Sequence, residues 1–186
     1  LVDARQEMFV FSTGQMWLEN THGAPLKGFE LNAQLQLDML PGIWSHFGVL
    51  ANYTRVESEI EYILTSSAGV VTSSTTADLV GLSKNSASGT LFYDDGVFSI
   101  RTTGTYRDKY IRGIPASAGS DLQGNGETFY LDAAASWNFN DYLTLILEAQ
   151  NLTEERNTLS IDSVREDTLF QTDIGRTYTL GATIKF

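Results

Sequence analysis

The chain has 186 residues, no cysteine and a formal net charge of −11. The absence of cysteine excludes disulfides and thiolate metal sites, and three prolines and two histidines leave little material for acid–base or metal chemistry. The acidic balance argues against nucleic acid as a partner, because phosphate binding needs clustered Lys and Arg. No apolar run reaches the roughly 20 residues of a membrane-spanning helix. Because the first residue is Leu1 and not Met, we expect a mature chain or a piece of one.

Alternation of apolar and polar residues with a period of two predicts strands, since successive side chains of a strand point to opposite faces. In chain order, a weak alternation predicts a first strand near 6–18. The segment 29–38 alternates well, and a weaker pattern continues near 44–60. The apolar face of 29–38 consists of Phe29, Leu31, Ala33, Leu35 and Leu37.

Two further strands are predicted near 84–93 and 97–112. The second of these carries polar and basic residues on one face, at every second position from Ser99 to Lys109, with Arg101 and Arg107 among them. Cations in so regular a pattern indicate a wet surface and not a packed core.

The last three predicted strands are 129–138, 143–150 and 176–186. The strand 143–150 has leucines on one face and polar residues on the other, and Ile146 is the exception on the polar face. The final strand places Tyr178, Leu180, Ala182, Ile184 and Phe186 on one face. Each of these segments is about the length that crosses the apolar band of an outer-membrane barrel.

The predicted connections alternate in length. Short ones fall at 40–42, 94–96 and 138–141, and longer polar stretches fall near 19–25, 61–83, 113–126 and 153–175. Outer-membrane barrels have short periplasmic turns and long outer loops in this order. Aromatic residues near the predicted strand ends fit the girdles of such barrels, although aromatic residues favour any strand. The pattern therefore predicts an all-β fold, an antiparallel transmembrane β-barrel with about eight strands in this chain.

The end of the chain, YTLGATIKF from Tyr178 to Phe186, resembles an outer-membrane insertion signal, with Tyr178, Leu180, Ile184 and Phe186 as its apolar positions. Five stretches resemble the C-terminal part of a TonB-dependent receptor: LKGFEL at 26–31, YRDKY at 106–110, LDAAAS at 131–136, LEAQNLTEE at 147–155 and GRTY at 175–178. The resemblance covers nearly the whole chain.

The resemblance implies that residues 1–186 are the last eight strands of a 22-stranded barrel in the bacterial outer membrane, with the C-terminus in the periplasm. Its partners would be its own N-terminal plug and remaining strands, the TonB complex, the barrel assembly machinery, outer-membrane lipid and a small-molecule nutrient. The final strands are most similar to the branch linked to oligosaccharide uptake, and siderophore receptors share most of their features. The alternatives are a complete eight-stranded barrel with a structural or adhesive role, and a soluble β-sandwich with a ligand-binding face.

We expect no enzyme, no cofactor and no metal, since His22 and His46 lie far apart in the strand map and no nucleophile or metal motif is present. Glu57, Glu59 and Glu61 share a face and could form a calcium site, but an exposed strand extension is the favoured interpretation. The acidic loop 153–175 is interpreted in the same way as solvated.

Candidate ligand-binding residues gather near the predicted outer rim. Cations there could bind hydroxyls or charges, polar residues of the next loop could join them, and aromatic rings could stack on a sugar. Ion pairing inside the barrel is the alternative role for the cations. The candidates are Arg107, Lys109, Tyr110, Arg112, Asp121, Asn125 and Phe129.

Overall fold

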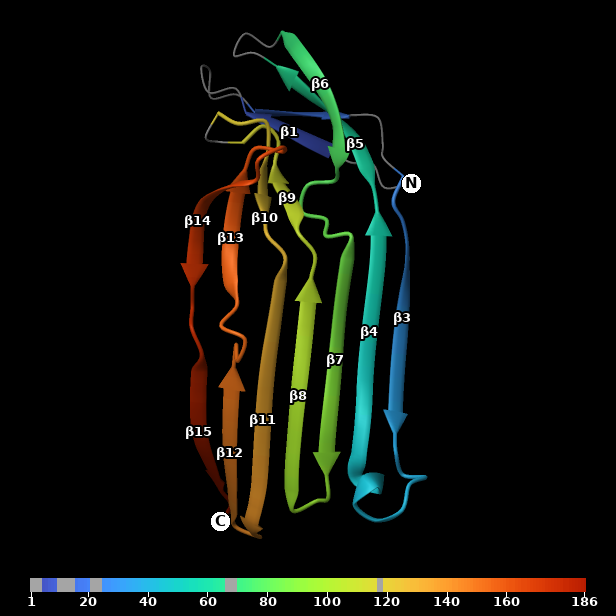
Figure 1. The fold of residues 1–186 in the computed structure, drawn as a ribbon, viewed down its shortest axis with the longest axis vertical. Helices are drawn as coiled ribbons and strands as arrows, with labels where there is room; N and C mark the ends of the chain where they lie inside the picture. The colour runs from blue at the N-terminus through green and yellow to red at the C-terminus, as the bar shows by residue number, and fades with distance from the viewer. Residues whose placement is uncertain (1–4, 10–15, 21–24, 66–69, 117–118) are drawn as a thin grey trace.

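The computed structural model describes residues 5–9, 16–20, 25–65, 70–116 and 119–186. Its main feature is a seven-stranded antiparallel sheet in the order β15-β12-β11-β8-β7-β4-β3, which forms a single curved wall (Figure 1). Its strands are β3 (Lys27–Gln36), β4 (Phe47–Glu57), β7 (Asn85–Asp94), β8 (Phe98–Arg107), β11 (Thr128–Asn140), β12 (Leu143–Gln150) and β15 (Thr177–Ile184). Among the described residues, no helix is long and apolar enough to cross a membrane.

One face of this sheet is apolar along its whole width. The register places Leu35 opposite Val49 and Val49 opposite Leu91, and on the other side of the sheet Leu147 lies opposite Leu180. These side chains are not covered by protein: Leu147 is 52% exposed and Leu180 is 80% exposed. We call this surface the apolar face.

The opposite surface, which we call the polar face, carries side chains that hydrogen-bond to one another across the strands. Asn52 donates to Glu30 Oε1 at 2.9 Å and to Asn32 Oδ1 at 2.6 Å. The hydroxyls of Thr90 and Thr103 lie 2.9 Å apart. The two faces therefore divide apolar from polar side chains, as the alternation predicts for a wall between lipid and water.

Very few side chains in the described part of the chain are buried. The buried apolar residues are Ile60, Tyr62, Ala116 and Leu159, and none of them lies in the seven-stranded sheet. A soluble sandwich would bury its inner leucines between two layers. Here the leucines of β12 and β15 face outward from one layer, so the sandwich interpretation is wrong.

The two ends of the sheet differ. At the C-terminal end of β15 the strands are joined by short turns at 95–97 and 141–142 and by a segment with the 3-10 helix η1 (Gly42–His46). The strand predicted near 44–60 thus begins only at Phe47, and the connection before it is longer than the predicted turn at 40–42. Aromatic rings gather here: Phe47 and Tyr93 lie 5.1 Å apart, and Trp137 and Phe139 lie 5.2 Å apart.

At the other end the chain continues as further strands, which lie in or beside the long polar connections predicted at 61–83, 113–126 and 153–175. One hairpin is formed by β5 (Glu59–Thr65) and β6 (Val71–Asp78). A four-stranded sheet has the order β14-β13-β10-β9; its strands are β9 (Tyr110–Gly113), β10 (Gln123–Asn125), β13 (Arg156–Ile161) and β14 (Asp167–Asp173). We call it the outer sheet. Polar strands outside the membrane need no apolar face, and so the alternation could not reveal them.

The strand predicted near 6–18 is also different in the structure. β1 (Arg5–Phe9) and β2 (Met16–Asn20) pair with each other as antiparallel arms, with Arg5 opposite Asn20, and neither joins the seven-stranded sheet. Alternation indicates extended chain but does not indicate which strand is the neighbour, and this is why two short arms were predicted as one long strand.

The seven-stranded sheet is open within the described residues. β3 and β15 lie at its two edges, and each has a single neighbour. A complete small barrel would need these edges to pair, so the described strands do not form the closed eight-stranded alternative.

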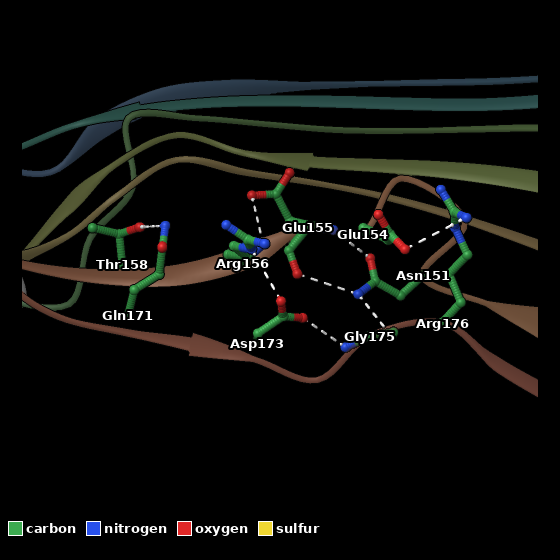
Figure 2. A network of polar contacts seen from close by, with 9 residues as sticks. All are labelled: Asn151, Glu154, Glu155, Arg156, Thr158, Gln171, Asp173, Gly175 and Arg176. Atoms are coloured by element: carbon green, nitrogen blue, oxygen red, sulfur yellow. Dashed lines mark hydrogen bonds and ion pairs between the residues drawn. The ribbon is translucent and has the colours of Figure 1, made fainter.

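Asn151 fixes the junction between the main sheet and the outer sheet (Figure 2). It is 7% exposed and has a positive φ of 54°. Its side-chain oxygen accepts from the Glu155 amide at 2.8 Å, while its side-chain nitrogen donates to the carbonyls of Glu155 at 3.2 Å and Gly175 at 3.1 Å. The backbone amide of Asn151 donates to the Asp132 carboxylate at 2.8 Å. One side chain thus links the end of β12 to the starts of β13 and β15.

Neighbouring contacts strengthen this junction. The Thr153 hydroxyl donates to the Phe129 carbonyl at 2.8 Å, and the Phe129 amide donates to the Glu155 carboxylate at 3.0 Å. Arg176 donates to the Leu152 carbonyl at 3.1 Å and lies 3.5 Å from the Glu154 carboxylate (Figure 2). The outer sheet is therefore held in a fixed position above the main sheet.

A charge on the apolar face should destabilise the folded protein. We expect Leu147→Arg to lower the free energy of unfolding in lipid vesicles by about 2–4 kcal/mol, because the guanidinium would lie in hydrocarbon. Thr179→Arg is the control, since Thr179 lies on the polar face opposite Glu148. Equal losses in the two variants, measured by denaturant titration of the full-length protein, would contradict this assignment of the faces.

Replacing Asn151 should lower the free energy of unfolding by more than the loss of its backbone conformation alone would. Asn151→Gly keeps the positive φ but removes the side-chain hydrogen bonds of a buried group, and we expect it to lower the free energy of unfolding by about 2–4 kcal/mol. Glu154→Gly is the matched control, because Glu154 has the same φ of 54° and an exposed side chain. Its unfolding free energy should change by less than about 1 kcal/mol. A similar change in both variants would show that Asn151 acts only through its φ.

Candidate ligand-binding surface

The candidate surface lies on the outer sheet, where the loops between its strands are braced against one another. The Lys109 ammonium lies 2.5 Å from the Glu166 carboxylate, which belongs to the turn between β13 and β14. The amide of Asp162 donates to the Leu122 carbonyl at 3.2 Å. These contacts join segments that are 40 to 57 residues apart in sequence, so the β13–β14 turn is fixed against the loops beside β9 and β10.

Arg107 is a structural member of this surface. Its guanidinium donates to the Ser83 hydroxyl at 2.7 Å and to the Gly81 carbonyl at 3.2 Å. The same group lies 4.0 Å from the ring centre of Tyr110, a cation–π arrangement. Arg107 therefore holds the Tyr110 ring in place, and two of its donors are used within the chain.

Asp121 holds the β13–β14 turn through Ser163. The Asp121 carboxylate accepts from the Ser163 hydroxyl, from the Ser163 amide at 3.0 Å and from the Leu122 amide at 2.8 Å. These hydrogen bonds favour the charged form, and the Ser163 hydroxyl has the largest part in lowering the pKa of Asp121 below its ordinary value of 3.8.

Three of the seven predicted residues line one pocket of 250 Å³ between β9, β10 and β13: Lys109, Tyr110 and Asn125. Asp121 lines a neighbouring open hollow, which shares Asp162 and Ser163 with this pocket. The structure thus brings four of the seven candidates into one continuous region. We call the first of these two hollows the outer pocket.

Arg112 and Phe129 lie apart from the outer pocket. Arg112 is exposed on β9 and forms no ion pair with any described residue. Phe129 lies over Gly104 on the apolar face, where a Cβ added to Gly104 would be 3.3 Å from the ring. Phe129 was predicted as a ring that could stack on a sugar, but the direction of its side chain places its ring with the apolar residues.

Each acidic residue that lines the outer pocket lies close to a cation, although Arg165 is shared between Asp162 and Asp167. Asp78 lies 2.9 Å from Lys84, Asp162 lies 3.1 Å from Arg165, and Glu166 is paired with Lys109. The raised pKa of Lys109 has the hydrogen bond to Glu166 as its main cause. The pocket is therefore polar and none of its lining acids lacks a nearby cation, although the whole chain is acidic.

The predicted calcium alternative has no matching geometry. Glu57 is paired with Arg55, and no group of three or more acidic or histidine side chains in the described ranges could hold a metal ion. His46 lies at the end with the short turns, 5.7 Å from the ring of Tyr93. His22 lies outside the described residues.

The contact of Asp121 with Ser163 should depend on pH. A carboxyl whose pKa is lower in the folded state stabilises that state above its ordinary pKa and loses this effect as the pH falls through the lower value. In a Val164→Cys variant of this cysteine-free chain, a spin label at position 164 should become more mobile as the pH falls through this lowered pKa, below the ordinary value of 3.8. Adding Asp121→Asn should make the label mobile at pH 7 as well. A label of unchanged mobility in that variant would show that Asp121 does not hold the turn.

Comparison with known proteins agrees with this architecture. A family model described as "TonB dependent receptor-like, beta-barrel" matches residues 14–152. No curated protein and no solved structure gave a match. The matched residues include β3, β4, β7, β8 and β11 of the main sheet. This family consists of transporters of the bacterial outer membrane and is not a family of enzymes, and the chain belongs to the TonB-dependent receptors through their β-barrel domain.

Proposed function

We propose that this chain is part of a receptor that binds a scarce nutrient outside the cell and imports it into the periplasm with energy from the TonB complex. The family membership supports transport. The braced outer sheet adds a rigid, polar surface with a pocket at the end opposite the short turns. A surface held in this way can bind a ligand with little loss of conformational freedom.

The rest of the proposal concerns the parts that complete the barrel. Unpaired strand edges are very costly in lipid, and this supports pairing of β3 and β15 with further strands of a 22-stranded barrel, of which residues 1–186 would be the C-terminal part. A plug inside the barrel would couple it to TonB. The barrel assembly machinery would recognise the side chains of Tyr178, Leu180, Ile184 and Phe186. The first three are at least 62% exposed on the apolar face of the last strand.

The orientation follows from the same proposal. Leu143 lies opposite Ile184, so the end of β15 is at the same end of the sheet as the short turns. Short turns are typical of the periplasmic side. The C-terminus would then be periplasmic, and the outer sheet would face the outside of the cell.

A neutral oligosaccharide is the ligand that the outer pocket favours. The observation that carries this proposal is that each acid lining the pocket lies close to a cation, so that the lining consists of hydroxyls, amides and paired charges. An anionic ferric siderophore, the second candidate, would prefer uncompensated cations. Arg107 and Arg112 are the candidate cations without an ion pair among the described residues. Arg107 donates to neutral groups and lies over the Tyr110 ring, and exposed charges of this kind are weak attractions.

Uptake by a deletion strain tests the proposed function. Removal of the gene should abolish growth on at least one neutral oligosaccharide supplied at low concentration, because such a molecule is too large and too dilute for passive entry, while growth on its monosaccharide should continue. Removal of TonB should give the same loss. Unchanged growth of the deletion strain on every oligosaccharide and ferric siderophore supplied, with TonB intact, would contradict the proposal.

A further inference from the structure

Asn125 is unusual among the polar residues of the outer sheet. Its side-chain oxygen is buried and has no hydrogen-bond partner, and it is the only such side-chain atom in the described part of the chain. Buried polar atoms of folded proteins are almost always paired, so an unpaired acceptor needs an explanation. Asn125 also lines the outer pocket, which gives a donor from outside the chain a place to bind.

The surroundings of Asn125 make this acceptor costly to leave unpaired. In the register of the outer sheet Asn125 lies between Tyr110 on β9 and Leu159 on β13, and Leu159 is only 5% exposed. An apolar neighbour lowers the local dielectric, which strengthens any hydrogen bond that forms there and raises the cost of an unpaired group.

The backbone keeps the outer pocket open. A Cβ added to Gly124 would be 3.3 Å from the Tyr110 carbonyl oxygen and 3.5 Å from the Ser160 hydroxyl, and one added to Gly126 would be 3.5 Å from Thr158. These neighbours all line the pocket. Glycine at both positions therefore leaves the space that a side chain would reduce.

The size of the pocket limits what it can hold. Pockets that enclose a whole small ligand are about 300–1,000 Å³, and the outer pocket has 250 Å³. This volume suits one ring of a larger molecule. Its lining combines the Tyr110 ring with the hydroxyls of Thr158 and Ser160 and with charges that are already paired.

We propose that the outer pocket takes one hydroxyl-bearing ring of the imported molecule and that Asn125 Oδ1 accepts a hydrogen bond from a hydroxyl of that ring. This inference rests on the proposed function and adds to it a specificity-determining residue. A site that hydrogen-bonds a ligand hydroxyl discriminates strongly against ligands that lack it, because its own buried group is then left unpaired.

The test uses the full-length receptor in detergent and titration calorimetry with a fixed set of probes: glucose hexamers with α-1,4, β-1,4 and β-1,3 linkages, a galactose hexamer and anionic ferric citrate. Asn125→Leu removes the acceptor and should weaken binding of the neutral hexamer that the wild type binds by at least about tenfold. Asn125→Asp keeps an acceptor and should bind within about threefold of the wild type. Gln36→Leu, which removes an exposed amide at the far end of β3, is the control and should bind as the wild type does.

The possible failures are distinguishable. If the wild type binds a neutral hexamer and Asn125→Leu binds it equally well, the role of Asn125 is wrong and the proposed function stands. Equal weakening in Asn125→Asp and Asn125→Leu would also overturn the role of an accepted hydrogen bond. If the wild type binds ferric citrate alone, or none of the probes, the inferred ligand class and the role of Asn125 both fail. Heat-dependent mobility of each variant in gel electrophoresis confirms that its barrel is folded.

Discussion

Backbone amides and carbonyls in the interior of a bilayer have no water to bond, and each must find a partner in the protein. In this chain seven antiparallel strands meet that requirement through their neighbours, from β15 to β3, in a sheet with few irregularities. Only the outward edges of β3 and β15 lack a partner in the described chain. Because the backbone is paired within the sheet, the side chains are not needed for this pairing. One face of the wall is apolar and exposed, and the other is polar and hydrogen-bonded.

Beyond the apolar band the constraint is relaxed, because water can satisfy the backbone. The strands continue there as a hairpin and as the outer sheet (Figure 1). Specific polar contacts, and not lipid, determine how these strands are arranged. Asn151 joins the ends of three strands, Asp121 holds the β13–β14 turn through Ser163, and Lys109 reaches Glu166 from a distant part of the chain. The rigidity of the candidate binding surface comes from these contacts and not from a hydrophobic core, which in the described chain is limited to a few residues around Ile60 and Tyr62.

The sequence was sufficient to predict those parts of the fold in which lipid determines the residues. The segments 143–150 and 176–186 alternate because one side meets hydrocarbon, and they form β12 and β15 with the expected faces. Alternation could not distinguish one strand from two paired arms near 6–18, nor could it find polar strands such as β13. For the site, the structure brings Lys109, Tyr110, Asp121 and Asn125 into one region, while their part in ligand binding stays a prediction.

The role of Asn151 was missed although its motif was noticed. The stretch 147–155 was valued only as a mark of family resemblance, and nothing in a single sequence says that an Asn is buried or has a positive φ. An Asn directly after a strong strand, followed by Leu, Thr and Glu, is a usable signal, since Asn tolerates a positive φ and its amide can bond backbone groups nearby. Phe129 is a different case, because the alternation of 129–138 already places it on the apolar side of its strand, and the structure has its ring there, beside Gly104.

The central claim is that the alternate side chains of one strand face hydrocarbon and water. Spin labels placed one at a time at positions 143–150 of the full-length receptor in lipid vesicles measure this directly, through collisions with oxygen, which concentrates in lipid, and with a water-soluble nickel complex. The account predicts that oxygen reaches 143, 145, 147 and 149 and that these positions exclude nickel, whereas the even positions collide less with oxygen, including 146, where the native residue is the apolar Ile146. Collision rates without a period of two, or an Ile146 position that behaves like Leu147, would contradict it.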